Sequence, residues 1–381
     1  MAVQPWSMPL FVVLACSGAA AVAWVARPIP RRVRICLTAT ACAVLLALTA
    51  VAWWVSSGAD NTYGQMIYLD ALAVLVVILV IFLALAALLS RLARRRIPGA
   101  VARPRPKRFR RWMSVLAGIF GVLALILVVL VVAQRRLIYF PDGSDPGPAA
   151  QRSTLGSDVT LTTQDGLALH TWLFRPAGTP NGIAVLYAPG NGGNRLGRLE
   201  PAVAMANRGF TVLLLEYRGY GGNPGSPSEN GLALDAVAGA NYLTAQGFTP
   251  SRTIYLGESL GTGVVARLAA THPPAGVILR SPFTSLVDVA GADYPWLPAR
   301  RFLRDRFDSV ARLHDSPVPI VVLSGDADQL VPPSLSAALA DQVGNLHTET
   351  VLKGVGHNDA IWFSPYLADV VAEFANSVIP R

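Results

Sequence analysis

The chain has 381 residues, of which 52% are apolar and only 14% are charged, and its formal net charge is +9. Soluble domains carry about 25% charged residues, so this composition excludes both a single soluble domain and a disordered chain. Residues 1–136 hold 16 basic and 2 acidic side chains, whereas residues 137–381 hold 16 basic and 21 acidic ones. The basic excess therefore lies entirely in the apolar first part, which argues against a nucleic-acid partner.

Four apolar stretches occur in this first part, at about 10–26, 35–55, 66–89 and 113–133. Each is close to the roughly 20 residues that a helix needs to cross a bilayer, so residues 1–136 are predicted to form a membrane region with four transmembrane helices. A cleaved signal peptide is the alternative for the first stretch. We favour a span, because the positive charges follow this stretch, whereas a signal peptide carries them in front.

The loops between these stretches predict an orientation. Residues 91–112 carry ten Lys or Arg side chains and residues 27–34 carry four Arg, whereas residues 56–65 carry only Asp60. Basic loops stay in the cytoplasm. We therefore expect the N-terminus and everything after the fourth span on the extracytoplasmic side. We expect the basic 91–112 segment to contact the anionic lipids of the bilayer rather than nucleic acid.

Residues 137–381 alternate between β-branched apolar runs and helical patterns, which is typical of an α/β domain. Strands are predicted at 159–163, 167–174, 183–188, 211–216, 253–256, 276–279, 320–324 and 348–352. Helices are predicted at 195–207, 228–246, 260–271, 333–343 and 359–378. The first two strands read as a hairpin and the later ones as βαβ units, so we expect a mostly parallel eight-stranded sheet flanked by helices.

Cysteine and ligand spacing give no sign of a bound group. The three cysteines, Cys16, Cys36 and Cys42, all lie in the predicted spans. No metal-ligand spacing and no cofactor-binding motif occurs in the sequence, so neither a metal nor a cofactor is expected.

The turn after the fifth predicted strand carries the first chemical motif. Gly257-Glu258-Ser259-Leu260-Gly261 follows a β-branched run and precedes an apolar helical pattern. In such a G-x-S-x-G turn the serine adopts a strained conformation at the carboxyl edge of the sheet, and side chains at the glycine positions would clash with neighbouring backbone. We therefore expect Ser259 to be a nucleophile. An ordinary glycine-rich βα turn is the alternative.

A serine nucleophile needs a base, and the base needs a group that orients it. Among five histidines, His357 lies in a loop between the last predicted strand and the last predicted helix, on the same edge of the sheet as Ser259. The loop after the seventh predicted strand offers two carboxylates, Asp326 and Asp328, as the third member. All these candidates follow strands, so the fold would bring them together.

Stabilising an oxyanion needs two backbone N–H groups. Leu260, directly after the nucleophile, would supply one, and the loop after the third predicted strand would supply the other, with Asn191 as the best donor. The glycines of this loop also suggest a nucleotide site. The G-x-x-x-x-G-K-[ST] and G-x-G-x-x-G patterns are both missing, however, so we discount phosphate binding.

These motifs resemble the α/β-hydrolase superfamily, and within it the membrane-tethered serine hydrolases that include lysophospholipid lipases and protein depalmitoylases. The resemblance runs from about residue 137 to residue 379. Further matching motifs are Leu137-Ile138-Tyr139-Phe140-Pro141, Asp165-Gly166-Leu167, Tyr217-Arg218-Gly219-Tyr220-Gly221, Ser281-Pro282-Phe283-Thr284-Ser285, Tyr294-Pro295-Trp296-Leu297-Pro298 and Gly325-Asp326-Ala327-Asp328-Gln329-Leu330-Val331-Pro332. The resemblance implies that Asp328 is the acid and that Asn191 and Leu260 are the oxyanion donors. The chain departs from the family at Pro189-Gly190, where His-Gly is frequent.

The predicted activity is hydrolysis of a carboxylic ester or thioester through a Ser259–His357–Asp328 triad and an acyl-enzyme. The rival hypotheses are a catalytically silent hydrolase fold that serves as a binding or assembly module in the membrane, and a serine peptidase. Fold alone does not choose among them.

A cap over the site is expected at about 282–316, between the sixth and seventh predicted strands. Phe283, Tyr294 and Trp296 are candidate pocket residues there, beside several arginines. An acyl chain against these aromatics is one interpretation, and simple packing within the cap is the other. A site tethered at a bilayer favours lipid-like or acylated substrates.

Overall fold

A computed structural model describes residues 131, 133–295 and 299–380 of the chain. A compact unit begins at Ala133. The four predicted spans lie outside the described residues, except for the last positions of the fourth. Among the helices that the structure does describe, none has the length and apolarity needed to cross a bilayer.

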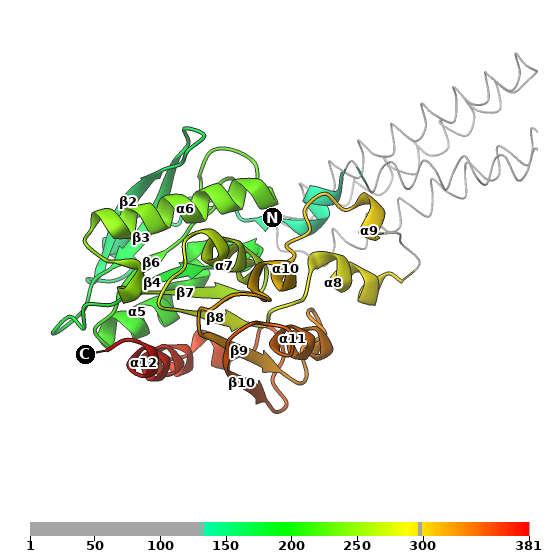
Figure 1. The fold of residues 1–381 in the computed structure, drawn as a ribbon. Helices are drawn as coiled ribbons and strands as arrows, with labels where there is room; N and C mark the ends of the chain where they lie inside the picture. Colours follow the sequence, from blue (N-terminus) through cyan, green and yellow to red (C-terminus); the bar gives the residue numbers. More distant parts are fainter. Residues whose placement is uncertain (1–130, 132, 296–298, 381) are drawn as a thin grey trace, which may run out of the picture. The chain divides into compact units, whose positions relative to one another are not determined.

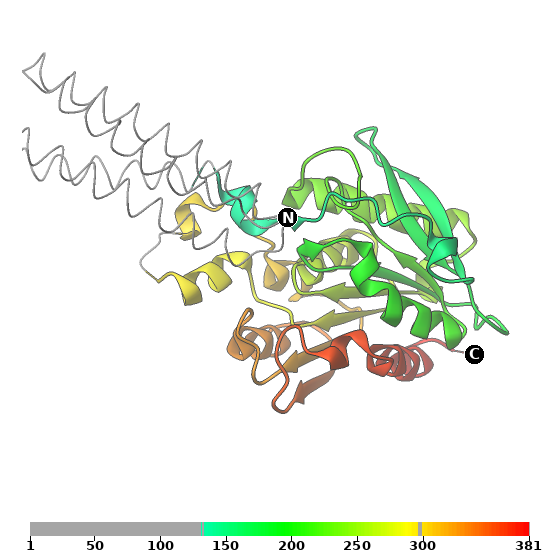
Figure 2. The ribbon, with the colours of Figure 1, turned by 180° about the vertical axis from the view of Figure 1, so that it is seen from behind.

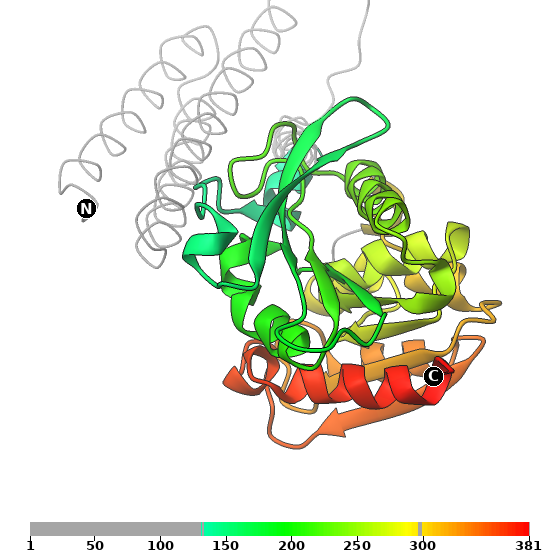
Figure 3. The ribbon, with the colours of Figure 1, turned by 90° about the vertical axis from the view of Figure 1, so that its left-hand side faces the viewer.

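An eight-stranded sheet forms the centre of this unit, in the order β10-β9-β8-β7-β4-β6-β3-β2 (Figure 1). Its strands are β2 (Gly156–Thr162), β3 (Ala168–Phe174), β4 (Ala184–Ala188), β6 (Thr211–Leu214), β7 (Thr253–Glu258), β8 (Gly276–Arg280), β9 (Ile320–Gly325) and β10 (Leu346–Leu352). Only the pairs β2–β3 and β3–β6 are antiparallel. Each predicted strand is present, and the mostly parallel sheet is confirmed. Figure 3 shows the sheet running from the β2–β3 hairpin to β10 beside α12.

Helices cover both faces of the sheet (Figures 1 and 2). They are α5 (Leu199–Asn207), α6 (Glu229–Ala245), α7 (Leu260–Thr271), α8 (Leu286–Asp293), α9 (Ala299–Phe302), α10 (Ser309–Leu313), α11 (Pro333–Ala340) and α12 (Tyr366–Val378), with the 3-10 turns η1 (Ala149–Gln151), η2 (Arg195–Arg198), η3 (Pro250–Arg252) and η4 (Ala360–Phe363). One core cluster holds α6, α7, α10 and α11, and the other holds α5 and α12. Strand β7 serves both, because Tyr255 packs in the first cluster and Ile254 and Leu256 pack in the second.

Two predicted helices are divided in the structure. The expected 359–378 helix is η4 followed by α12, because Ser364 precedes Pro365 and adopts an extended conformation (φ −90°, ψ 177°). The expected 195–207 helix is η2 followed by α5, and the break falls at Arg198, whose φ of −115° is not helical. The breaks put Arg198 and η4 close to the strand ends that carry the predicted site.

Helices α8, α9 and α10 lie within residues 282–316, where a cap is expected, and the residues directly after α9 are hydrogen-bonded to residues that follow Ala133. Residues 133–138 are helical. Arg135 forms two hydrogen bonds to Asp305, with Nε–Oδ2 at 2.9 Å and Nη2–Oδ1 at 3.2 Å, and the Tyr139 hydroxyl donates to Asp305 at 3.1 Å. The side-chain oxygen of Gln134 accepts a 2.7 Å bond from the Arg304 N–H. The start of this unit therefore holds the end of α9 and the residues that follow it.

Candidate active site

Ser259 stands at the turn between β7 and α7, as its motif predicted. Strand β7 is buried along its whole length, and α7 begins at the next residue. Between them Ser259 has φ 51° and ψ −118°, a backbone conformation that residues with a side chain rarely adopt. Such a strained conformation persists only where the surrounding structure fixes it, and here the packed strand and helix on either side keep Ser259 in it.

Close backbone contacts explain the two glycines of the motif. A Cβ at Gly257 would lie 2.6 Å from the carbonyl oxygen of Gly261. A Cβ at Gly261 would overlap the carbonyl oxygen of Ala188 and lie 2.6 Å from that of Pro189. Only glycine therefore allows the end of β4 to approach the start of α7, and this approach places the loop after β4 beside Ser259.

His357 lies between Ser259 and Asp328. Its Nε2 is 3.0 Å from Ser259 Oγ, and its Nδ1 is 2.7 Å from Asp328 Oδ2. The other carboxylate oxygen of Asp328 accepts 2.9 Å bonds from the N–H groups of Leu330 and Val331. Burial raises the pKa of Asp328, but the hydrogen bonds from His357 and from these N–H groups outweigh it, so the pKa lies below its usual range. Asp328 is therefore an anion at neutral pH.

The structure separates the two aspartates that the sequence offered. Asp326 Oδ1 accepts a 2.5 Å bond from the Gly354 N–H and so holds the start of the histidine loop. Asp328 is the carboxylate that contacts the His357 ring. The other four histidines interact elsewhere: His170 with Thr160, His272 with Thr271, His314 with the Gln342 carbonyl and His347 with Ser377.

Asn191 is held on three sides in the loop after β4. Its Nδ2 donates to the Ile138 carbonyl at 2.7 Å, and its own carbonyl accepts from the Phe140 N–H at 3.0 Å and the Tyr220 hydroxyl at 2.9 Å. Within the described part of the chain, the backbone N–H groups of Asn191 and Leu260 have no hydrogen-bond partner. Fixed and unpaired N–H groups are suited to bind an anionic oxygen.

The three predicted pocket aromatics differ in their surroundings. Phe283 is 2% exposed and belongs to the core cluster that includes Leu260 and Phe307. Tyr294, directly after α8, is 52% exposed. Trp296 lies outside the described residues. The role of these residues in an acyl pocket stays a prediction.

The sequence analysis missed three charged residues that meet at Glu258, the neighbour of Ser259 in the chain: Glu258 and Arg280 are buried, and the Arg198 side chain is 12% exposed. Glu258 Oε1 lies 2.6 Å from Arg198 Nη2 and 3.0 Å from Arg280 Nη2, and the Tyr187 hydroxyl donates to Oε2 at 2.9 Å. Burial raises the pKa of Glu258, but the two guanidinium groups and these hydrogen bonds outweigh it and hold the pKa well below its usual range. The sequence did carry a signal for this cluster: Glu258 and Arg280 each end an apolar run that predicts a strand. Charged residues are rarely buried unless they are paired, so two of opposite sign at such positions indicate an ion pair.

Comparison with known proteins agrees with this architecture. Residues 183–318 match the family model described as the alpha/beta hydrolase fold. The uncharacterized protein Rv2307c of Mycobacterium tuberculosis is 44% identical over 250 residues, which cover 65% of this chain and 89% of that protein. The alpha/beta hydrolase domain-containing protein WAV2 of Arabidopsis thaliana is 30% identical over 242 residues, covering 58% and 79%. The lysophosphatidylserine lipase ABHD12 of Danio rerio is 27% identical over 328 residues, covering 72% and 85%.

A solved structure shows the same fold. The esterase of Pyrococcus furiosus, 19% identical, superposes with a TM-score of 0.53 over 64% of this chain and 98% of its own. At this identity the likeness concerns the fold. With the sheet order, the strained serine turn and the close relatives together, the chain belongs to the α/β-hydrolase superfamily.

Proposed function

We propose that this protein is a membrane-anchored serine hydrolase that cleaves carboxylic ester or thioester bonds of lipid-like or acylated substrates. The observation that carries the proposal is the hydrogen-bonded row Ser259–His357–Asp328, with distances of 3.0 and 2.7 Å, at a strained strand-to-helix turn. Three residues from three separate strand ends meet there with the geometry that nucleophilic catalysis requires.

Acylation follows from this geometry. Ser259 Oγ attacks the carbonyl carbon of the substrate while His357 Nε2 takes the hydroxyl proton. The resulting oxyanion accepts hydrogen bonds from the N–H groups of Asn191 and Leu260, and each such donor contributes about 3–4 kcal/mol in comparable sites. When the intermediate collapses, His357 gives its proton to the departing alcohol or thiol. The acyl group stays on Ser259 as an ester.

Deacylation repeats these steps with water. His357 Nε2 removes a proton from a water molecule, which attacks the acyl-enzyme, and the same proton returns to Ser259 as the acid leaves. Asp328 accepts the Nδ1–H of His357 throughout, so the ring keeps Nε2 free for the proton transfers and its positive charge is stabilised.

The substrate class rests on the cap and on relatives. Arg300, Arg301 and Arg304 are exposed on and after α9, which is tied to residues 134–139 directly after the last predicted span. A lysophosphatidylserine lipase is among the relatives. Exposed arginines beside a bilayer favour anionic headgroups, so we propose lysophospholipids as the first substrates to test.

Labelling with a fluorophosphonate probe tests the nucleophile. We expect the probe to label the full-length protein in detergent micelles and to leave Ser259→Ala unlabelled. Ser251→Ala, which changes an exposed serine in η3, is the matched control and should be labelled like the wild type. Labelling of Ser259→Ala would contradict the proposal.

A substrate panel on the wild-type protein without probe separates the rival functions. It should contain short and long acyl esters, lysophospholipids, acyl thioesters and peptides. Turnover of esters or thioesters without peptides supports the proposal, peptide turnover supports the peptidase, and the absence of turnover and labelling supports a silent binding module. A reporter fused after Arg381 tests the side of the membrane, since a periplasmic-type reporter is active only outside the cytoplasm.

A further inference from the structure

The Glu258 carboxylate connects two loops of the site through two arginines. Arg198, which pairs with Glu258, donates from Nη1 to the Gly192 carbonyl at 2.9 Å, in the loop that carries Asn191. Arg280, the second partner of Glu258, donates from Nη1 to the His357 carbonyl at 2.8 Å. One carboxylate adjacent to Ser259 in the chain is therefore linked to the backbone of both neighbouring loops.

Aromatic rings complete the environment of these arginines. The Arg280 guanidinium lies 5.4 Å from the ring centre of Trp362 and 5.9 Å from that of Phe363, and Arg198 lies 6.0 Å from Phe363. Both rings belong to η4, which follows the histidine loop. Trp362 Nε1 also donates to the Gly356 carbonyl at 2.8 Å. The histidine loop is thus held at two successive carbonyls, and cation–π contacts fix the arginine that holds one of them.

We propose that Arg280 is a positioning residue that, with Glu258 as its anchor, fixes the backbone of His357 relative to Ser259. This inference rests on the proposed function. Arg280 touches neither the Ser259 hydroxyl nor the His357 ring in the described contacts. It acts through the peptide carbonyl of His357, 2.8 Å from Nη1, and through Glu258, whose main chain continues into Ser259.

The shape of the guanidinium explains why arginine serves here. Its Nη1 donates to the His357 carbonyl, while its Nη2 lies 3.0 Å from Glu258 Oε1 as an ion pair that lacks hydrogen-bond geometry. A lysine ammonium on a flexible stem would keep the buried charge beside Glu258 but would not hold both partners in one geometry. Arg280→Lys therefore loosens the histidine loop and leaves the ion pair in place. Displacements of about 1 Å at a reacting centre cost on the order of 100-fold in rate.

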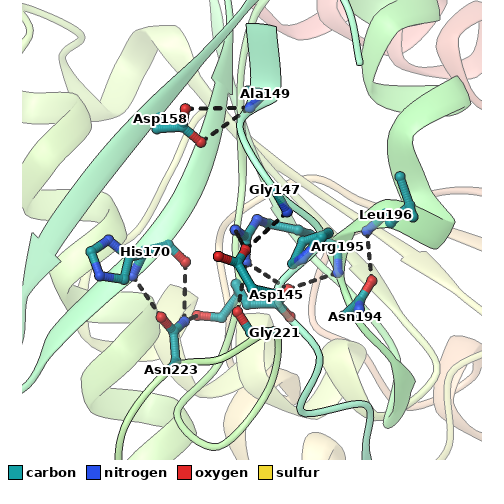
Figure 4. Close-up of polar contacts among 12 residues, drawn as sticks. Asp145, Gly147, Ala149, Asp158, His170, Asn194, Arg195, Leu196, Gly221 and Asn223 are labelled. Carbon is teal, nitrogen blue, oxygen red and sulfur yellow. Dashed lines mark hydrogen bonds and ion pairs between the residues drawn. The ribbon is translucent and has the colours of Figure 1, made fainter. Parts of the chain in front are cut away.

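Arg195 offers a matched control, because it has the same environment in a different place. It is 2% exposed, against 1% for Arg280, and its Nη1 lies 3.1 Å from the buried carboxylate of Glu216. It donates to the Gly221 carbonyl at 3.3 Å and lies 5.0 Å over the ring of Trp172. Figure 4 shows Arg195 among its polar contacts, with Asp145 as a further partner and no triad residue among those labelled.

The experiment compares Arg280→Lys with Arg195→Lys in the full-length protein in micelles. Amide hydrogen exchange of residues 354–359 and the steady-state kinetics of a short acyl ester are measured for both variants. We expect Arg280→Lys to exchange faster in this loop and to lose roughly 10- to 100-fold in kcat with KM changed less than about threefold. Arg195→Lys should keep the wild-type exchange in this loop and the wild-type kcat.

Equal loop exchange and equal kcat in Arg280→Lys and the wild type would overturn the inference. So would Arg195→Lys values that match those of Arg280→Lys. If Arg280→Lys does not fold, Tyr187→Phe replaces it, since this variant removes one hydrogen bond from Glu258 and keeps both arginines. It should show the same changes to a smaller extent, and wild-type behaviour would overturn the inference.

Failure of the proposed function gives a different pattern. A wild-type protein without Ser259-dependent labelling would contradict the hydrolase assignment. The exchange comparison would still decide whether Arg280 holds the histidine loop, because it does not depend on turnover.

Discussion

Replacing Asp328 by asparagine tests the orientation of the His357 ring. Asp328 Oδ1 accepts from the N–H groups of Leu330 and Val331, so the side-chain oxygen of the introduced asparagine should keep these two 2.9 Å bonds. The amide nitrogen then faces His357 Nδ1, where the 2.7 Å contact with Oδ2 is now. An amide nitrogen donates, so Nδ1 must accept, and the ring proton moves to Nε2. A protonated Nε2 cannot take the Ser259 proton.

The expected loss is about 10⁴-fold in kcat at pH 7, the size seen when the same change is made in a comparable triad. This corresponds to about 5 kcal/mol of transition-state free energy. The geometry outside the ring should survive, so KM should change little. Ester hydrolysis by the full-length protein in micelles measures both constants.

Asp326→Asn is the matched control, because Asp326 is the other aspartate of the same loop and does not contact His357. Asp326 Oδ1 accepts from the Gly354 N–H, and an asparagine oxygen can accept the same bond. We expect its kcat to stay within about threefold of the wild type, since a neutral acceptor weakens one hydrogen bond by roughly 1 kcal/mol or less. A kcat of Asp328→Asn within tenfold of the wild type, or an equal loss in Asp326→Asn, would refute the reasoning.

Asp328→Asn should also change how the stability of the protein depends on pH. The pKa of Asp328 in the folded protein lies below its ordinary value of 3.8, so the folded state favours the ionised carboxylate. Its contribution to stability is complete above about pH 4 and is lost as the pH falls through the lower, folded-state pKa. Asp328→Asn should therefore lose less stability than the wild type on acidification below pH 4, as thermal unfolding midpoints would show.

Two further predictions concern packing. Gly261→Ala should abolish folding or probe labelling, because the added Cβ would overlap the Ala188 carbonyl oxygen. Gly291→Ala on α8 is the control, since its Cβ would meet no atom within 4 Å. It should leave the free energy of unfolding unchanged or raise it by about 0.5–1 kcal/mol, as thermal unfolding would show. Asp305→Ala should destabilise the unit by about 1–3 kcal/mol, since it leaves the buried Tyr139 hydroxyl unpaired. Adding Tyr139→Phe should restore part of this loss, and strictly additive unfolding free energies would contradict the proposed contact.

The sheet and its chemistry could be predicted because both follow local rules. β-Branched runs located the eight strands to within a few residues, and the residues that close each strand fall at one edge by topology alone. The helix ends were less predictable. Pro365 breaks the last predicted helix, a signal that was present in the sequence, whereas the non-helical Arg198 depends on its contacts with Glu258 and the Gly192 carbonyl.

The choice between Asp326 and Asp328 shows where residue-level reasoning stops. Both follow β9, but Asp326 is exposed and holds the Gly354 N–H, whereas Asp328 is buried against His357. The Asp328 side chain is fixed by the N–H groups of Leu330 and Val331 in the following turn. Both candidates are aspartates, so residue type alone does not say which of them this backbone turn fixes. Resemblance to a family supplied the answer that spacing left open.

Charge counting has a related limit. The 16 basic and 21 acidic residues of 137–381 weigh equally in a sum, but Arg195, Arg218 and Arg280 are buried against carboxylates and contribute little to the field outside. Arg198, 12% exposed at its side chain, is also paired with a carboxylate. The exposed Arg300, Arg301 and Arg304 do contribute to it. A region with an acidic net charge can therefore present exposed basic side chains on and after α9. This is why anionic lysophospholipids belong in the substrate panel although the net charge of this part would argue against them.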